Sequence, residues 1–275
     1  MTQPSELEDP QAIFRNMAKS QKWDLELGFC AISAAEDSVK SIPQLQSALR
    51  QITRKIHIPA GADPFEQTAR IRYVLFEQCG FEGSVTDYNA FHNSLLSHAL
   101  THKRGLPITL SVLTLCIAER LNVPLEGVKA PGHFLLRKPD ADPQFFIDPF
   151  HKGQIIRHHE LKAQLEKQHG KMDPEALENA TETASVKDIF VRINNNLLIS
   201  YRRVEHHYGV MRCLERLRLL LPDNPQLIRA RAQLLTRSGL YDEAIKELEY
   251  YVNQFPEAID IEDALRELSL LKGIN

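Results

Sequence analysis

His133 and Asp148 are the two residues of this chain whose types and spacing suit acid–base chemistry. Each lies in a short apolar run, at 132–136 and 145–149, and the segment between the runs, 138–143, is rich in proline and aspartate. If the runs form a hairpin folded about the middle of that segment, position 133 faces position 148 on one side of a sheet. The spacing therefore predicts a hydrogen bond between the two side chains, and a carboxylate that orients an imidazole makes a general base wherever a nucleophile stands nearby.

The elements that must position this pair begin with helices. From residue 10 to about 81, apolar residues recur every three or four positions, which is typical of amphipathic helices. A loop at 80–88 leads to two further helical segments, 89–102 and 107–121. The second of these opens on Pro107 after Gly105, because glycine ends helices well and proline suits a first helical turn.

Beyond residue 124 the pattern changes from helix to strand. The remaining apolar runs are short and separated by turns, which predicts a small antiparallel sheet. Together with the helices before it, this sheet is predicted to form an α+β domain. The four predicted strands are residues 125–128, 132–136, 145–149 and 153–156.

The last third of the chain is helical and repeats itself. With Gly239 and Tyr241 in its second copy, the pattern resembles a tetratricopeptide repeat, in which pairs of helices stack on their neighbours. An unrelated pair of helical hairpins with the same spacing is the alternative. The matches, at a constant offset of 34 residues, are Leu198 with Ala232, Tyr201 with Leu235, Val210 with Ala244, Leu214 with Leu248, Leu217 with Tyr251, and Pro222 with Pro256.

The predicted domain limits follow from these patterns. Residues 1–160 form the α+β domain, the polar stretch 161–187 is a linker, and 188–275 holds two helical hairpins and a cap. In the second hairpin, Ala244 is expected at the closest approach of two helices and Gly239 in the turn between them.

Composition and charge exclude several classes of protein. The chain has 275 residues, 43% of them hydrophobic, and its 33 basic and 36 acidic residues give a net charge of −3, so no basic field recruits nucleic acid directly. No apolar run approaches the roughly 18 residues of a membrane span, and the first residues lack the features of a signal peptide. The four cysteines have no CxxC spacing. We therefore expect a cytoplasmic protein with reduced thiols and no cofactor.

Four ordered runs give the chain a specific likeness. Residues 88–94 (YNAFHNS), 104–110 (RGLPITL), 130–137 (APGHFLLR) and 146–150 (FIDPF) resemble the SirB-type family, described as a transglutaminase-like core joined to tetratricopeptide repeats. The resemblance implies a papain-like fold in which His133 matches the base and Asp148 the orienting acid.

The resemblance also implies a cysteine nucleophile, and here the chain departs from the pattern. In active relatives the cysteine stands about four helical turns before a Gly-Ile-Pro-like element, which this chain has as residues 122–124. Counting back reaches residues 107–109, Pro-Ile-Thr, where no cysteine exists. The base and the acid are retained by position, and the nucleophile position is vacated.

Thr109 and Cys116 are the two substitutes that the sequence offers. Thr109 is well placed, but its hydroxyl is rarely activated and more often bonds a free N–H group of the first helical turn. Cys116 lies on the same helix face about 10 Å further along the axis. Because its helical neighbours are apolar, we expect a buried thiol rather than a nucleophile. Those neighbours are Val112, Leu113 and Ile117.

Three residues near the predicted cleft are binding candidates. Asn93 suits either a hydrogen bond at the cleft or a helix cap, and Arg104 suits either a peptide carboxylate or an ordinary surface ion pair. Pro131 directly precedes the Gly-His of the first strand run.

A metal site is a further alternative, built from histidines. His92, His98 and His102 lie on one helical segment, and with His133 and Asp148 they offer ligands of the types that zinc prefers. Lys103 and Arg104 follow directly, which favours a solvated helix end, so the prediction is no metal.

The sequence thus predicts a pseudoenzyme, a transglutaminase-like protein that acts without catalysis as an interaction or regulatory module for a protein or peptide partner. A cross-strand His–Asp pair without a nucleophile can simply lock a hairpin or orient a ligand. The alternative is a hydrolase or acyltransferase on peptide or amide bonds. That enzyme would use His133 and Asp148 with Thr109, Cys116 or a bound water.

Overall fold

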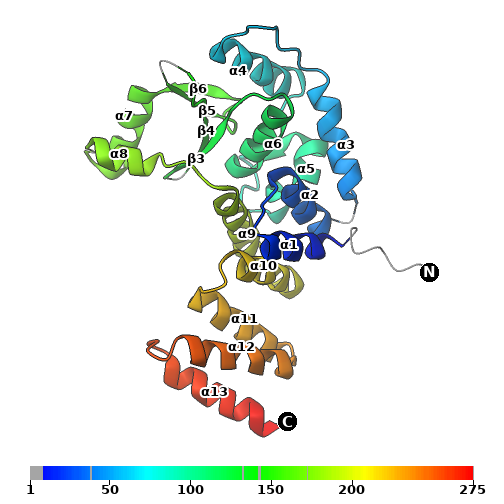
Figure 1. The fold of residues 1–275 in the computed structure, drawn as a ribbon, viewed down its shortest axis with the longest axis vertical. Helices are drawn as coiled ribbons and strands as arrows, with labels where there is room; N and C mark the ends of the chain where they lie inside the picture. The colour runs from blue at the N-terminus through cyan, green and yellow to red at the C-terminus, as the bar shows by residue number, and fades with distance from the viewer. Residues whose placement is uncertain (1–8, 38, 132, 142–143, 172, 275) are drawn as a thin grey trace, which may run out of the picture. The chain divides into compact units, whose positions relative to one another are not determined.

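The computed structural model describes residues 9–37, 39–131, 133–141, 144–171 and 173–274. It divides into two compact units, Met1–Asn196 and Leu197–Asn275, and the division falls inside α9 (Val186–Arg203) (Figure 1). In the described part of the chain, no helix combines the length and the apolar character needed to cross a bilayer. Each unit is treated below by itself.

The first unit begins with helices whose starts are fixed by aspartate and proline. Asp9 and Asp63 accept the backbone N–H groups of Gln11 and Glu66 at 3.0 and 2.7 Å, and a proline occupies the first turn of each helix. A carboxylate at the cap and a proline that needs no partner together leave few free N–H groups. The elements are α1 (Pro10–Ser20), α2 (Leu25–Glu36), α3 (Ile42–Thr53), α4 (Pro64–Arg72) and the π-helical turn η1 (Tyr73–Gln78).

Helix α6 (Pro107–Arg120) is the centre of the first unit. Twelve of its 14 residues are buried, as expected of a helix that is apolar on all sides. It follows the short helices η2 (Phe91–Ser94) and α5 (Leu96–His102). Two brief strands, β1 (Glu82–Gly83) and β2 (Arg104–Gly105), pair in parallel beside it.

The predicted small antiparallel sheet is present and confirms the α+β class. Its strand order is β3-β4-β5-β6, and every neighbouring pair is antiparallel. Figure 1 shows the sheet between α6 on one side and α7 on the other. The strands are β3 (Glu126–Ala130), β4 (His133–Arg137), β5 (Phe145–Asp148) and β6 (Gln154–Arg157).

The register between β4 and β5 differs from the predicted one by two residues. Leu136 pairs with Ile147, which sets Asp148 across from Leu135 and not from His133. The connection is longer than the turn assumed from the sequence, since Arg137 pairs with Phe146 rather than with Gln144. Within it, Lys138 is fully buried and forms an ion pair with Asp140. A shift of two residues keeps every side chain on its predicted face, whereas a shift of one would have reversed them all.

The two faces of the sheet are covered by different helices. Leu135 and Phe146 lie on one face and pack against Leu161 and Leu165 of α7 (His158–His169). Their neighbours in the strands face the other way, toward α6, whose Ser111 hydroxyl donates to the backbone of β4 at 3.1 Å. Residues 161–187, predicted as a linker, instead hold most of α7 and all of α8 (Pro174–Ala180) inside the first unit.

The second unit consists of stacked helices, as the repeat predicts. Gly239 lies in the turn between α11 and α12 with a left-handed φ of 73°, and Ala244 is fully buried. Around Ala244, buried side chains of α11, α12 and α13 form one apolar cluster. The helices after α9 are α10 (His207–Leu220), α11 (Pro225–Arg237), α12 (Tyr241–Gln254) and α13 (Ile261–Ile274).

Candidate functional site

Asp148 ends strand β5 and is held as a hydrogen-bond acceptor. Its carboxylate is almost entirely buried. One oxygen accepts the backbone N–H groups of Phe150 and His151 at 3.0 and 3.3 Å, and the other lies 2.7 Å from His151 Nδ1. The imidazole that Asp148 orients is therefore that of His151.

His133 shares a sheet face with Asp148 but not a hydrogen bond. The two-residue shift in register separates them, and among the described residues no hydrogen bond joins them, so the predicted cross-strand bond is wrong. The ring centre of His133 lies 6.3 Å from that of His151. The site thus contains two imidazoles beside one carboxylate.

The cavity at this site is small and closed by α7. Pro131, His133 and Asp148 line it together, and its volume is about 20 Å³. That is room for about one water molecule and not for a peptide bond with its flanking residues. The side chains of α7 that close it are Leu161, Gln164 and Leu165.

Thr109 lies away from this cavity. It is fully buried near the start of α6, and its hydroxyl donates to the backbone oxygen of Asn93 at 2.8 Å. Since α6 covers the opposite face of the sheet from α7, Thr109 and His133 belong to different sides of the sheet. The hydroxyl anchors η2 to α6. It does not bond the N–H groups of the helix's first turn, so that predicted role is wrong.

Cys116 is buried in α6, as predicted. Its exposed fraction is 1%, and Val112, Leu113 and Ile117 are buried around it. Burial raises the pKa of the Cys116 thiol well above its ordinary value, and the negative charge of Glu26 raises it further. A thiol that resists ionisation and has no access to solvent is a poor nucleophile.

Replacing Cys116 with serine is expected to lower the free energy of unfolding by about 1–3 kcal/mol, because a hydroxyl in an apolar site needs a partner. Urea unfolding followed by circular dichroism measures the change. The half-buried Cys79 provides the matched control, since Cys79→Ser should change stability by less than half as much. Equal effects of the two substitutions would contradict the burial of Cys116 in an apolar core.

The other two binding candidates have structural partners. Asn93 is buried and donates its side-chain amide to the backbone oxygen of Asp87 at 2.7 Å, which ties the preceding loop to η2. Arg104 forms an ion pair with Glu82 in β1, and Lys152 approaches the same carboxylate at 2.9 Å. Hydrogen bonding by Lys152 lowers the pKa of Glu82, and the charge of Arg104 lowers it further.

The three histidines of the metal alternative stack on one another. The ring centres of His92 and His98 are 4.2 Å apart, and those of His98 and His102 are 4.4 Å apart. Within the described ranges no group of three histidine, cysteine or acidic side chains has the arrangement of a metal site. Burial lowers the pKa of His98 to about 4, and the positive charges of His92 and His102 lower it further, while Asp37 opposes them.

This stack makes stability depend on pH. The unfolded chain binds a proton at His98 near pH 6.5 and the folded chain only near pH 4, so stability should fall as the pH drops between these values. We expect a loss of roughly 1 kcal/mol, reduced by solvent screening of a partly exposed ring. His98→Gln should reduce that slope in pH-dependent unfolding experiments, although His92, whose pKa burial also lowers, keeps part of it, and exposed His57→Gln should leave it intact. An unchanged slope in His98→Gln would contradict the neutral stack.

His151 is the site residue that sequence reasoning missed. The prediction sought the partner of Asp148 across the hairpin, whereas the structure has it three residues later in the same chain. The available signal was an aspartate at a strand end before a proline, a pattern typical of a turn in which the side chain bonds the next N–H groups. Such a turn brings the residue at the third position back to the carboxylate.

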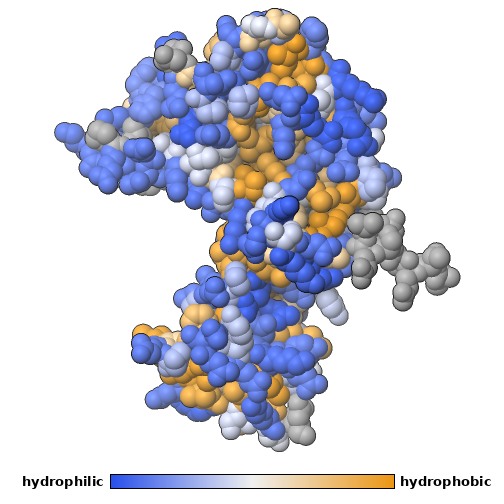
Figure 2. All heavy atoms as spheres, in the orientation of Figure 1, coloured by the Kyte–Doolittle hydropathy of each residue, from blue (hydrophilic) through white to orange (hydrophobic). Residues whose placement is uncertain are grey.

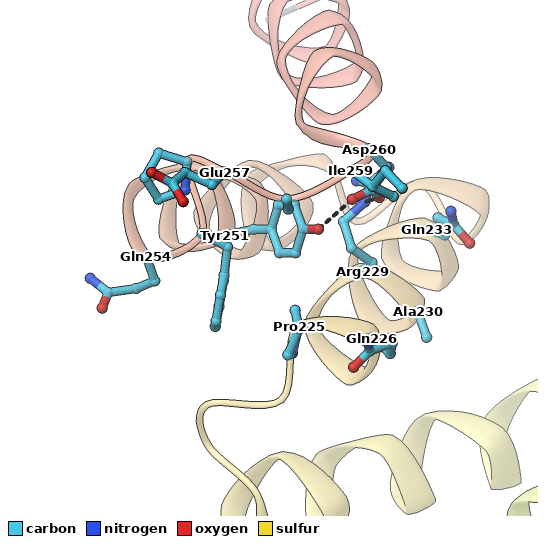
Figure 3. A pocket seen from close by; sticks show the side chains of 13 residues that line it. Pro225, Gln226, Arg229, Ala230, Gln233, Tyr251, Gln254, Glu257, Ile259 and Asp260 are labelled. Carbon is cyan, nitrogen blue, oxygen red and sulfur yellow. Dashed lines mark hydrogen bonds and ion pairs between the residues drawn. The ribbon is translucent and has the colours of Figure 1, made fainter.

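A larger groove lies in the second unit, along α11 and the segment that joins α12 to α13. Its volume is about 860 Å³. Figure 3 shows Gln226, Ala230 and Gln233 along one face of α11, with Gln254 on α12 and Ile259 in the connecting segment. Figure 2 shows apolar side chains reaching the surface among polar ones in this unit.

An ion-pair network forms the floor of this groove. Arg229 is almost buried and binds Asp260 and Glu267 at 2.9 and 3.1 Å. The Tyr251 hydroxyl donates to the other oxygen of Asp260. Burial raises the pKa of Tyr251 to about 12, and its bond to Asp260 contributes. The guanidinium is therefore committed to neighbours within the unit.

Comparisons with known proteins agree with both units. A model of the transglutaminase-like superfamily matches residues 40–195, and a tetratricopeptide-repeat model matches residues 197–268. No solved structure gives a significant match.

Similar curated proteins come from bacteria and from mammals. A UPF0162 protein of Xylella fastidiosa is 31% identical over 201 residues, which are 72% of this chain and 71% of that protein. One from Haemophilus influenzae is 28% identical over 242 residues, covering 86% and 89% of the two chains. F-box only protein 21 of Mus musculus is 32% identical over 184 residues, which are 63% of this chain and 28% of that protein. The chain therefore belongs to the transglutaminase-like superfamily, with a tetratricopeptide-repeat module after that core in sequence.

Proposed function

We propose that this protein is a non-catalytic, transglutaminase-like interaction module of the cytoplasm whose repeat unit binds an extended segment of a partner protein. One observation supports the absence of catalysis. Helix α6, which should present the nucleophile, covers one face of the sheet, whereas His133 and Asp148 lie on the other face. Thr109 and Cys116 on that helix are buried, and α7 closes the small cavity at the histidine. A nucleophile must lie within hydrogen-bond reach of its base.

The groove of the second unit supports the interaction half. Gln226, Gln233 and Gln254 line it, and each side-chain amide offers a donor and an acceptor that suit a peptide backbone. Ala230 and Ile259 add apolar contacts for alternate side chains of an extended segment. Because Arg229 is already paired, the lining residues that the structure describes offer no free cation to an acidic ligand, and Glu257 favours a partner segment with basic residues.

Fluorescence anisotropy on the full chain tests this proposal. The probes are labelled decapeptides of alanine and serine that carry lysine, leucine or glutamate at four central positions. We expect the lysine peptide to bind best and Ala230→Trp, which fills the groove, to weaken binding at least tenfold. Asn253→Ala, an exposed position of α12 outside the groove lining, is the control and should leave binding unchanged. Failure of every peptide to bind, or equal binding by Ala230→Trp, would contradict the proposal.

A hydrolase is the second candidate, favoured by the Asp148–His151 pair. The His151 side chain is 54% exposed while its Nδ1 is held by a buried carboxylate, an arrangement that can activate a water molecule as a general base. Turnover of fluorogenic peptide amides that disappears in His151→Gln, with the fold intact, would select this candidate over the first.

A further inference from the structure

A second large cavity lies in the first unit, outside the histidine site. It is formed where the start of α4 meets the start of β5, the end of β6 and the start of α7, and its volume is about 650 Å³. Sites for small molecules in proteins have volumes of about 300–1,000 Å³ and mostly apolar walls with a few polar groups. The lining residues that carry the following argument are Asp63, Phe65, Phe145, Ile155, Arg157 and His158.

The wall of this cavity is aromatic and partly open to solvent. Phe145 is paired with Arg157 across β5 and β6, so both side chains lie on one face of the sheet, with Ile155 beside them. From α4, Phe65 packs edge-on against Phe145 with ring centres 5.7 Å apart, yet its side chain remains 55% exposed. Figure 2 shows apolar surface in the region of α4. A planar apolar group placed here would cover Phe65 and gain contacts with two rings.

The cavity is also lined by a positively charged side chain, that of Arg157. The Arg157 guanidinium has no hydrogen-bond or ion-pair partner among the residues that the structure describes. The carboxylates beside it are engaged, because Asp63 caps α4 by accepting the Glu66 N–H at 2.7 Å and Glu160 accepts the backbone N–H of Arg157 at 2.7 Å. His158 and His159 also line the mouth. An anion would therefore meet donors here, and a guanidinium suits a carboxylate in particular, since it can bind both oxygens.

We propose that this cavity binds a small aromatic carboxylate. Its ring lies against Phe65 and Phe145, and its carboxylate is bound by Arg157 at the mouth. The proposal goes beyond the interaction function, because it concerns the first unit and uses no residue of the peptide groove. In this proposal the exposed side chains of His158 and His159 are further hydrogen-bond donors to the carboxylate of the ligand.

Isothermal titration of the full chain with 2-naphthoate and with its neutral analogue 2-naphthamide tests this site. We expect naphthoate to bind and the amide to bind at least tenfold more weakly, because only the acid carries the charge that Arg157 recognises. Arg157→Gln should weaken naphthoate binding at least tenfold, and Phe65→Ala should weaken both probes. Both residues are largely exposed, so neither substitution threatens the fold.

Two substitutions on the same region serve as matched controls. Arg70→Gln removes another exposed arginine of α4, and Tyr73→Ala removes another exposed aromatic ring next to it, and neither residue lines the cavity. Naphthoate binding should be unchanged in both. The proposal is overturned if naphthoate does not bind, if the amide binds as tightly as the acid, or if Arg157→Gln and Arg70→Gln have the same effect.

Discussion

Replacing Arg229 with methionine is expected to lower the stability of the α11–α13 helices by about 2–4 kcal/mol. The guanidinium holds Asp260 and Glu267 at 2.9 and 3.1 Å and lies over the ring of Tyr251 at 5.4 Å. Removing one member of a buried ion pair costs about 3–5 kcal/mol, because the other charge is left uncompensated. Here the two carboxylate side chains keep 36% and 24% of their exposure, which reduces the loss.

Hydrogen exchange of the α11–α13 amides in the full chain measures this loss. Arg237→Met, an exposed arginine at the end of α11, is the control and should change the exchange free energies by less than 0.5 kcal/mol, roughly the range of surface substitutions. Restoring charge balance with Arg229→Met, Asp260→Asn and Glu267→Gln together should recover part of the loss. If Arg229→Met and Arg237→Met behave alike, the network does not join α11 to α13.

Replacing Ala244 with leucine is the second large effect, about 1–3 kcal/mol of destabilisation from overpacking. Ala244 has no exposed surface and lies in the cluster formed with Ile228, Leu248 and Ala264. Three added heavy atoms have no space there, so α11 and α12 must separate. Lys246→Leu, at an exposed position of the same helix, should be nearly neutral in thermal melts. If the melting temperature of Ala244→Leu is no lower than that of Lys246→Leu, the close pairing of these helices is contradicted.

The order and type of the elements could be predicted because each has a local signal. Proline and aspartate mark helix starts, short apolar runs mark the four strands, and the 34-residue offset marks the stacked helices. The parallel pair β1 and β2 had no such signal. Each strand has two residues, and Gly83 is required there because a side chain would meet the ring of Phe150, more than sixty residues away in sequence.

The candidate site could be predicted only in part, because its geometry depends on a register that no local pattern encodes. Alternation of side chains correctly gave His133 and Asp148 a common face. The connection between β4 and β5 buries Lys138 in an ion pair with Asp140, although lysine is a residue that is almost always exposed, so nothing in the sequence indicated this arrangement. With this register, Asp148 lies across from Leu135 rather than from His133, and its carboxylate contacts His151 instead.

The role of α7 could not be predicted for a related reason. Most of its residues are polar or charged, so its sequence resembles a linker. Among the side chains of α7 that the structure describes, only Leu161 and Leu165 are deeply buried, and both pack against the sheet face that bears His133. A helix that contributes so few apolar residues has too weak a periodicity to reveal which face it covers.

Alkylation of the folded full chain by iodoacetamide, with mass spectrometry of the peptide that contains Cys116, tests most directly whether the core has lost its nucleophile. Half-buried Cys79 serves as the internal standard of a partly accessible thiol. We predict that Cys116 is labelled only as fast as the chain unfolds, and that His133→Ala and His151→Ala do not slow this labelling. Labelling of Cys116 that is faster than that of Cys79 and is lost in either histidine variant would contradict the non-catalytic core.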